Sequence, residues 1–188
     1  MTRFSSLLLP GLIHLGSLAV VGSAWAYQWA GLLPCILCLQ QRVPHYVLLF
    51  FLVPTVVMFF VGQFLPSLYA IYRKAFYVVA TVTMGAAVFL AAKHIGVEYG
   101  WWKGPMACGG LVEKMSSPDQ LFALERPDCS KPTIIWPGLS MATWHLLAVL
   151  PLLGLSIFGL SRNIFSRKFD DGRDAIEEIE PCPCTPTC

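Results

Sequence analysis

The stretch VPHYVLLFFLVPTVVMFFVGQF, residues 43–64, contains no Asp, Glu, Lys or Arg and decides the fold class. Its length suffices to cross the membrane, because a helix spans about 30 Å of hydrocarbon with roughly 17–25 residues. Pro54 falls inside the stretch, and membrane helices tolerate such a kink because neighbouring groups satisfy the freed carbonyl. The sequence therefore predicts a transmembrane helix here.

Three other stretches, residues 7–26, 75–92 and 142–161, are similarly apolar. Of the 188 residues, 56% are hydrophobic and 13% are charged, against roughly 45–50% and about 25% in an ordinary soluble domain. The apolar residues form long blocks, which disfavours the alternative of a soluble helical bundle. The first block also imitates a cleavable signal peptide, but it exceeds the roughly 7–15 apolar residues usual in one, so we expect a retained anchor.

We therefore predict an all-α membrane protein, a four transmembrane helix bundle with a long irregular second extracytoplasmic loop. Residues 1–165 form this domain. Residues 166–188 form a cytoplasmic tail that we expect to be disordered, because it combines acidic residues with prolines.

The orientation follows from the number of spans and the positions of Lys and Arg. Four spans place both termini on one side, and loops 27–42 and 93–141 on the other. Basic residues flank the spans on the first side, which is therefore predicted to be cytoplasmic: Arg3, Arg73, Lys74, Arg162, Arg167 and Lys168. The formal net charge is only +2, and the basic residues lie at membrane edges or among acids, which is unlike a nucleic-acid interface.

Seven cysteines fall into three groups: Cys35 and Cys38 in the first outer loop, Cys108 and Cys129 in the second, and Cys182, Cys184 and Cys188 in the tail. The first four face one compartment. In an oxidising compartment such as the periplasm, an even set of exposed cysteines indicates disulfides, whereas cytosolic cysteines normally stay reduced.

Cys35-Ile36-Leu37-Cys38 is a C-x-x-C motif, whose spacing lets one sulfur attack while the other leaves. A structural bridge or half of a zinc site are alternatives, but structural zinc needs four ligands, so we expect no metal. Cys38 is predicted at or near a helix amino terminus, where the dipole favours a thiolate. Arg42 follows four residues later on the same face and would add a fixed positive charge. Alternatively, Arg42 has no catalytic role, and its long side chain only carries the charge to the polar edge of the membrane.

Cys108 and Cys129 permit two interpretations from the residues alone. A passive disulfide would close a loop of 20 intervening residues and contribute roughly 3 kcal/mol in the chain-entropy model. Alternatively, the pair is a shuttle, because the glycines and prolines around it suit a mobile loop that carries a thiolate to the C-x-x-C motif.

The sequence resembles the disulfide bond formation protein B (DsbB) family of quinone-linked membrane oxidases. The resemblance rests on PCILCLQQR at 34–42, on the cysteine pair in the second outer loop, and on WPGLSM at 136–141 leading through Trp144 into the last span. It covers about residues 1–165. It implies a bacterial inner (plasma) membrane location and an activity as a thiol:quinone oxidoreductase that supports disulfide bond formation.

The resemblance also implies a route for the electrons. A reduced periplasmic oxidase of the DsbA type attacks the Cys108–Cys129 disulfide, Cys108 takes the mixed disulfide, and Cys129 is released to attack Cys35. Cys38 is then the thiolate that faces ubiquinone or menaquinone, with Arg42 polarising the quinone. A quinone is physically required as the final electron acceptor. The DsbA-type protein is a strong oxidant, so the disulfide of an ordinary dithiol could not re-oxidise it alone.

The remaining polar residues are less informative. His94 loosely matches a family position near the quinone, and His45 and Glu98 are polar groups near outer span ends. For His94 and His45 the alternative is an interfacial histidine without a role at the quinone. His14 is expected to serve helix packing or a hydrogen bond. The tail cysteines depart from the family pattern. Thiolates suit Cu(I) or zinc, but we expect these three to be reduced and idle.

Two competing functions stay open. A related enzyme could serve one dedicated client, or could resemble vitamin K epoxide reductase, although the early C-x-x-C motif argues against the latter. The other class is a non-catalytic membrane protein, metal-handling or interacting, whose outer disulfides are structural.

Overall fold

The structure, a computed structural model, describes residues 3–104, 129–131 and 138–177. Over these ranges the regular elements are all helices: α1 (Arg3–Trp29), α2 (Ile36–Phe50), α3 (Leu52–Val61), α4 (Pro66–Glu98) and α5 (Met141–Glu177). Within the same ranges, four segments are long and apolar enough to cross a membrane: Leu7–Trp29, Ile36–Val61, Pro66–Glu98 and Met141–Ile164. The predicted all-α class with four spans is confirmed.

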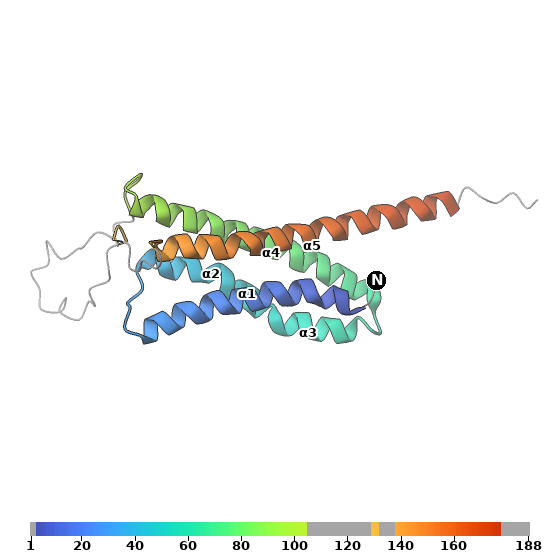
Figure 1. The fold of residues 1–188 in the computed structure, drawn as a ribbon. Helices are drawn as coiled ribbons and strands as arrows, with labels where there is room; N and C mark the ends of the chain where they lie inside the picture. Colours follow the sequence, from blue (N-terminus) through green and yellow to red (C-terminus); the bar gives the residue numbers. More distant parts are fainter. Residues whose placement is uncertain (1–2, 105–128, 132–137, 178–188) are drawn as a thin grey trace, which may run out of the picture.

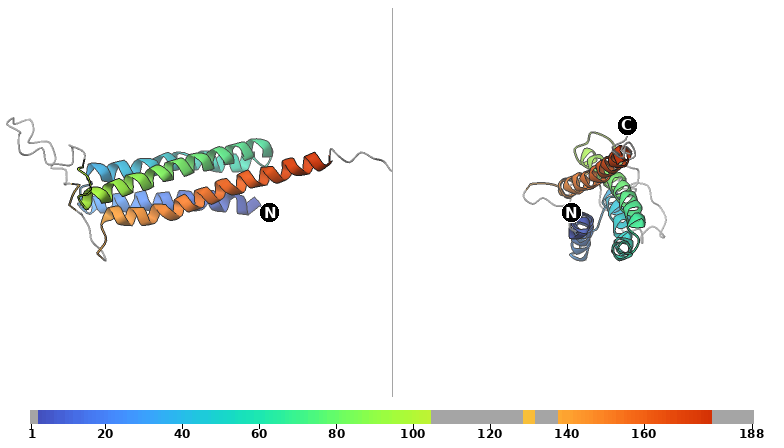
Figure 2. Two further views of the ribbon diagram at one scale, coloured as in Figure 1. Left: turned by 90° about the horizontal axis from the view of Figure 1, so that it is seen from above. Right: turned by 90° about the vertical axis from the view of Figure 1, so that its right-hand side faces the viewer.

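The helices lie side by side along one common direction (Figures 1 and 2). One end of the bundle gathers the end of α1, the start of α2, the end of α4 and the start of α5 (Figure 1). The start of α1 and the turn between α3 and α4 lie toward the opposite end. We call the first end the Cys35 end, because Cys35 immediately precedes α2. The two predicted outer loops therefore leave the bundle at the same end.

The second span is broken at Phe51, between α2 and α3. Pro54 has no N–H, so the carbonyl of Phe50 lacks its helical donor. The Thr55 backbone N–H and Oγ1 both donate to the Phe51 carbonyl, at 2.9 and 2.7 Å, and Oγ1 lies 2.8 Å from the Tyr72 hydroxyl of α4. The predicted kink is thus present, and a hydroxyl network supports it. Pro151, in contrast, lies inside an unbroken α5.

The core of the bundle combines large side chains with small ones. Buried residues of the four spans form one cluster: Ile13, Leu48, Phe76, Tyr77, Ala80, Met84, Ala87, Val149 and Leu152. Helices α4 and α5 make the most extensive contact. Small residues allow this close approach, as is usual between membrane helices. Gly159 is one of them, because an added Cβ would collide with the Tyr77 ring.

The outward faces are apolar, as a lipid environment requires. Phe50, Phe64 and Phe89 are 77%, 87% and 68% exposed in the isolated chain. At the Cys35 end, the exposed residues include Trp29, Tyr99 and Trp101, with the latter two rings stacked. Tryptophan and tyrosine concentrate at membrane–water interfaces. These aromatic residues therefore indicate that the Cys35 end lies at the edge of the hydrocarbon.

Three of the predicted boundaries differ from the structure. The second span begins at Ile36 instead of 43, so most of the motif at 34–42 is helical, and the third runs over Pro66–Glu98 instead of 75–92. Helix α5 continues to Glu177, so the tail predicted to be disordered from 166 starts as helix. Mixed acidic and basic residues in this stretch, with no proline before Pro181, are compatible with continued helix.

Candidate active site

Cys35 and Cys38 lie at the amino terminus of α2. Cys35 is the N-cap residue, with extended backbone angles, and its sulfur accepts a hydrogen bond from the Cys38 backbone N–H at 3.3 Å. The two thiols are free, and their sulfurs lie 3.0 Å apart. An approach of about 1 Å would bring them to the length of a disulfide bond. The expected position of Cys38 in the first turn of a helix is confirmed.

His94 of α4 stands against this pair. Its Nε2 atom lies 3.7 Å from the Cys35 sulfur and 3.8 Å from Oε1 of Glu98, one helical turn further along α4. The side chains of His94 and Glu98 are only 4% and 7% exposed. The family resemblance implied a place for His94 near the quinone, which stays a prediction; in the structure His94 contacts the sulfur of Cys35.

The surroundings of Cys35 stabilise its thiolate. The hydrogen bond with the Cys38 side chain is the largest influence and, although burial opposes it, the pKa of Cys35 falls from 9.0 to about 4, with the hydrogen bond from His94 contributing. When both cysteines are reduced, Cys35 is therefore the sulfur that carries the negative charge. The position of Cys38 at the helix amino terminus, beside Arg42, predicted the thiolate there. In the reduced pair the charge lies on Cys35 instead, because the hydrogen bond with Cys38 lowers the pKa of Cys35.

Cys129 comes to the same place from the second outer loop. It is disulfide-bonded and 1% exposed. It belongs to a buried cluster with Cys35, Leu37 and Val97, against which Cys38 also packs. The structure thus brings one cysteine of the second group to the C-x-x-C motif. Cys108 lies outside the described residues, and so do Cys182, Cys184 and Cys188, so their roles stay predictions.

Arg42 is 8% exposed, and it bridges two helices. Its guanidinium donates to Oε1 of Gln28 at 2.9 Å and to the carbonyl oxygen of Ala24 at 3.1 Å, both on α1. These bonds turn the side chain toward the neighbouring helix and away from water. The alternative of a snorkelling arginine is therefore not what the structure shows.

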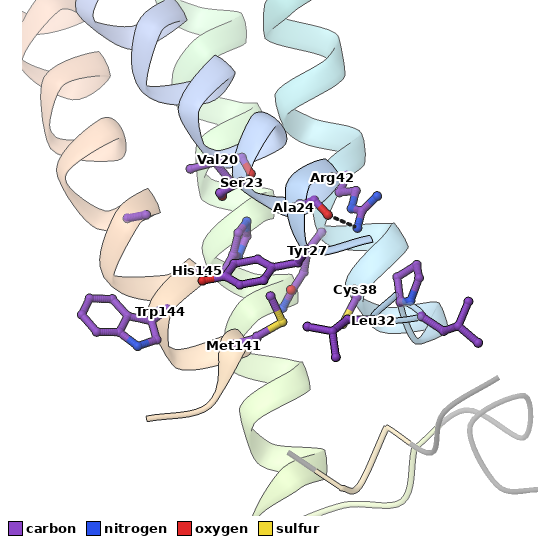
Figure 3. A pocket seen from close by; sticks show the side chains of 14 residues that line it. Val20, Ser23, Ala24, Tyr27, Leu32, Cys38, Arg42, Met141, Trp144 and His145 are labelled. Atoms are coloured by element: carbon purple, nitrogen blue, oxygen red, sulfur yellow. Dashed lines mark hydrogen bonds between the residues drawn. The ribbon is translucent and has the colours of Figure 1, made fainter. Parts of the chain in front are cut away.

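A cavity of about 430 Å³ opens beside Cys38 and Arg42 (Figure 3). Helix α1, the connection to α2, α2 itself and the start of α5 supply its walls, and apolar side chains predominate. Its lining residues are Val20, Ser23, Ala24, Tyr27, Leu32, Leu33, Pro34, Cys38, Gln41, Arg42, Met141, Trp144, His145 and Ala148. Cys35 and His94 are not among them. The cavity therefore approaches the cysteine pair from the Cys38 side.

Gln41 contributes an unusual group to this cavity. Its side chain is 5% exposed, and its Nε2 atom is buried with no hydrogen-bond partner among the described residues. A buried amide donor without a partner is costly unless something else binds it. A molecule with a carbonyl oxygen in the cavity would supply that partner.

The same residues could also be considered as a metal site. Ligand atoms of Cys35, Cys38 and His94 all lie within 4.8 Å of one another. They provide three ligands, whereas a closed structural zinc site needs four. A hydrogen-bonded pair of thiols with a neighbouring histidine is equally suited to thiol–disulfide exchange, in which a stabilised thiolate attacks or leaves.

Sequence reasoning found the cysteines and Arg42, but it missed several cavity residues. Gln41, Tyr27 and His145 received no role in the cavity. The missed signal was a pair of histidines in otherwise apolar spans, His45 and His145, whose side chains contact each other in the structure. The pattern of one helix does not show which residues of another helix it will face.

Comparison with protein families gives one result. The model of the family described as "Disulfide bond formation protein DsbB" matches residues 6–159, which include all four spans up to the last turns of the fourth. No curated protein and no solved structure gives a match.

Proposed function

Since the chain belongs to the disulfide bond formation protein DsbB family, we propose that this multi-pass membrane protein is a thiol:quinone oxidoreductase. It re-oxidises a periplasmic dithiol protein of the DsbA type and passes the electrons to ubiquinone or menaquinone in a bacterial plasma membrane. The observation that carries the proposal is the burial of Cys129 in one cluster with Cys35.

The proximity of these two cysteines matters because a thiolate must reach a disulfide sulfur directly to exchange with it. In the proposed cycle, the soluble dithiol attacks the Cys108–Cys129 disulfide at Cys108, and Cys129 leaves as a thiolate. Cys129 then attacks Cys35. A new bond forms between Cys35 and Cys129, the Cys35–Cys38 bond breaks, and Cys38 leaves with the electron pair.

Cys38 is well placed to hold that charge. It lies in the first turn of α2, where the helix dipole favours an anion. Arg42, one turn further along, provides a fixed positive charge at the same cavity. In this state Cys35 is bonded to Cys129 and no longer competes for the negative charge. The thiolate therefore faces the cavity from which an acceptor would approach.

The cavity residues fit a quinone head group. The walls are mainly apolar, the unpartnered Gln41 Nε2 suits a carbonyl oxygen, and Arg42 adds positive charge. A bound quinone supplies a two-electron acceptor that thiols alone lack. Gln41 and Arg42 would hold the head group, and Trp144 and the apolar residues would exclude water from the cavity.

The proposal is tested with purified protein, a reduced soluble C-x-x-C oxidase and a short-chain ubiquinone, with quinone absorbance as the readout. We expect the wild type to consume quinone and Cys38→Ser to stop it. Cys188→Ser, which removes a tail cysteine, is the matched control and should turn over normally. Full turnover by Cys38→Ser would overturn the assignment, and so would a wild-type protein that leaves the quinone oxidised.

A further inference from the structure

Two histidines from different helices meet inside the bundle. His45 of α2 is fully buried, and its Nε2 atom lies 3.1 Å from Nε2 of His145 of α5. The ring planes are nearly perpendicular, at 84°. At this distance one imidazole donates its N–H to the other. Two apolar spans are thus joined by one N–H···N hydrogen bond between two imidazole rings.

The pair adjoins the cavity. His145 lines it together with Cys38 and Arg42 (Figure 3), whereas His45 contacts His145 and is not a lining residue. The other ionisable group of the lining is Tyr27 of α1, and His94 and Glu98 of α4 lie on the Cys35 side of the cysteine pair.

Among the described residues of the cavity lining, His145 is the best suited to exchange protons. Guanidinium groups keep their protons in proteins. A phenol is a much weaker acid than an imidazolium, and an imidazole ring has one nitrogen that can accept a proton while the other donates one. Since Nε2 of His145 contacts His45, Nδ1 is the atom left for a molecule in the cavity. That Nδ1 atom is buried and has no hydrogen-bond partner among the described residues.

We propose that His145, backed by His45, transfers a proton between the Cys38 side of the cavity and a quinone oxygen. This inference rests on the proposed function and assigns that reaction a proton carrier. Once the oxidised soluble protein has left and Cys129 has returned to Cys108, Cys35 and Cys38 are both reduced, as a thiolate and a thiol. Their oxidation to a disulfide gives two electrons and one proton, and the second proton that a quinol needs was released when the soluble dithiol was oxidised.

The relay starts with one extra proton on the pair, so that His45 carries a proton on each nitrogen. His145 gives one proton from Nδ1 to a carbonyl oxygen and takes one at Nε2 from Nε2 of His45, and both rings are then neutral. A proton released by thiol oxidation then restores the pair, which ends the cycle unchanged.

The second ring gives the pair a property that a lone histidine lacks. A proton can leave His145 at one nitrogen while another arrives at the opposite nitrogen, so the imidazole need not rotate. The perpendicular packing of His45 against His145 keeps the nitrogens facing each other. His45 is therefore a positioning residue and a proton store, whereas His145 contacts the reacting molecule.

The first test concerns the unmodified protein without quinone. In ¹⁵N-histidine-labelled protein in membranes, NMR should show a through-hydrogen-bond N–N coupling between one nitrogen of His45 and one of His145. His14 of α1 is the internal reference, because its Nε2 contacts a hydroxyl, that of Thr55, and should give no such coupling. The absence of coupling between His45 and His145 would overturn the proposal.

The second test measures a single turnover of quinone reduction in H₂O and in D₂O. His145→Gln should slow the reaction at least about 100-fold, as expected for loss of a general acid, and should change the solvent isotope effect. His45→Gln should have a smaller effect in the same direction. His14→Gln, another buried histidine but outside the cavity lining, should match the wild type.

Binding and thiol exchange separate this proposal from the proposed function. Quenching of Trp144 fluorescence by short-chain ubiquinone and mixed-disulfide formation with the soluble partner should persist in His145→Gln, which also shows that the variant is folded. A normal rate of quinone reduction in that variant would overturn the relay but leave the function intact. A wild-type protein that cannot reduce quinone would overturn the function itself.

Discussion

Cys129 and Cys35, which lie far apart in the sequence, are buried in the same cluster at the amino terminus of α2. Leu37 and Val97 complete this cluster, and Cys38 packs against it. A purely structural disulfide in the outer loop would not need to lie beside the C-x-x-C motif. The shared burial is what a shuttle requires, and it favours the second of the two interpretations that the sequence left open.

The acidity of Cys35 should depend on His94. Replacement of His94 by Gln should raise the pKa of Cys35, because the histidine hydrogen bond is one of the influences that bring it to about 4. The ultraviolet absorbance of the thiolate, followed against pH in the reduced protein, measures this midpoint. His14→Gln, which lies beside Thr55, should leave it unchanged.

The lowered pKa of Cys35 also predicts how the stability of the reduced protein changes with pH. A folded pKa below the ordinary value of 9.0 means that the Cys35 thiolate stabilises the reduced fold fully above about pH 9. This contribution declines as the pH falls and is gone below about pH 4. Reduced wild type should therefore lose more stability on acidification than reduced Cys35→Ser, and equal losses in thermal unfolding would contradict the account.

Arg42 should resist replacement by lysine. Its guanidinium donates to two acceptors on α1, Gln28 and Ala24, which a lysine cannot reproduce with one ammonium group. We expect kcat/KM for quinone to fall roughly 10- to 100-fold, as for the loss of one charged hydrogen bond of about 1.5–3 kcal/mol. Arg73→Lys, at the opposite end of the bundle, is the control, and an equal effect in both variants would count against a role of Arg42 at the cavity.

Close packing between α4 and α5 should depend on Gly159. Gly159→Ala places a Cβ against the Tyr77 ring, and overpacking of this kind costs typically about 1–3 kcal/mol. Gly154→Ala, on the same helix, meets nothing within 4 Å and should be neutral or stabilising. Thermal unfolding in detergent compares the two variants, and similar midpoints would show that the helices pack differently.

The orientation of the bundle makes a separate prediction. Ala30→Cys, after α1, and Ser67→Cys, in the first turn of α4, lie toward opposite ends of the bundle and are both exposed. In a background free of other accessible cysteines, an impermeant maleimide should label Ala30→Cys in intact cells. Ser67→Cys should react only after the membrane is opened. The reverse pattern would place the Cys35 end in the cytoplasm and remove the periplasmic partner.

Much of the fold was predictable, because long uncharged stretches have few physical solutions other than membrane helices. The boundaries were not, for a specific reason. Gln41 and Arg42 made the start of α2 look like a loop, but in the structure Arg42 is bonded to α1. Arg73 likewise suggested a loop, whereas it donates to Oδ1 of Asn163 from within α4. A charge that finds a partner on another helix cannot be recognised from its own helix.

In the candidate site, too, local sequence patterns predicted some residues, whereas others depend on packing between helices. Cys35, Cys38 and Arg42 were predictable because one motif holds them at helical spacing. The position of Cys129 beside Cys35 and the contact between His45 and His145 depend on packing between helices, which no local pattern encodes.

The most direct test of the account is whether Cys35 and Cys129 form a disulfide with each other. In a Cys38→Ser, Cys108→Ser double variant, each of these two sulfurs loses its proposed partner but keeps its neighbour in the cluster. Peptide mapping by mass spectrometry after mild oxidation and thiol trapping should find Cys35 linked to Cys129. If both cysteines are instead recovered as trapped free thiols, the two pairs do not exchange, and the proposed electron route is contradicted.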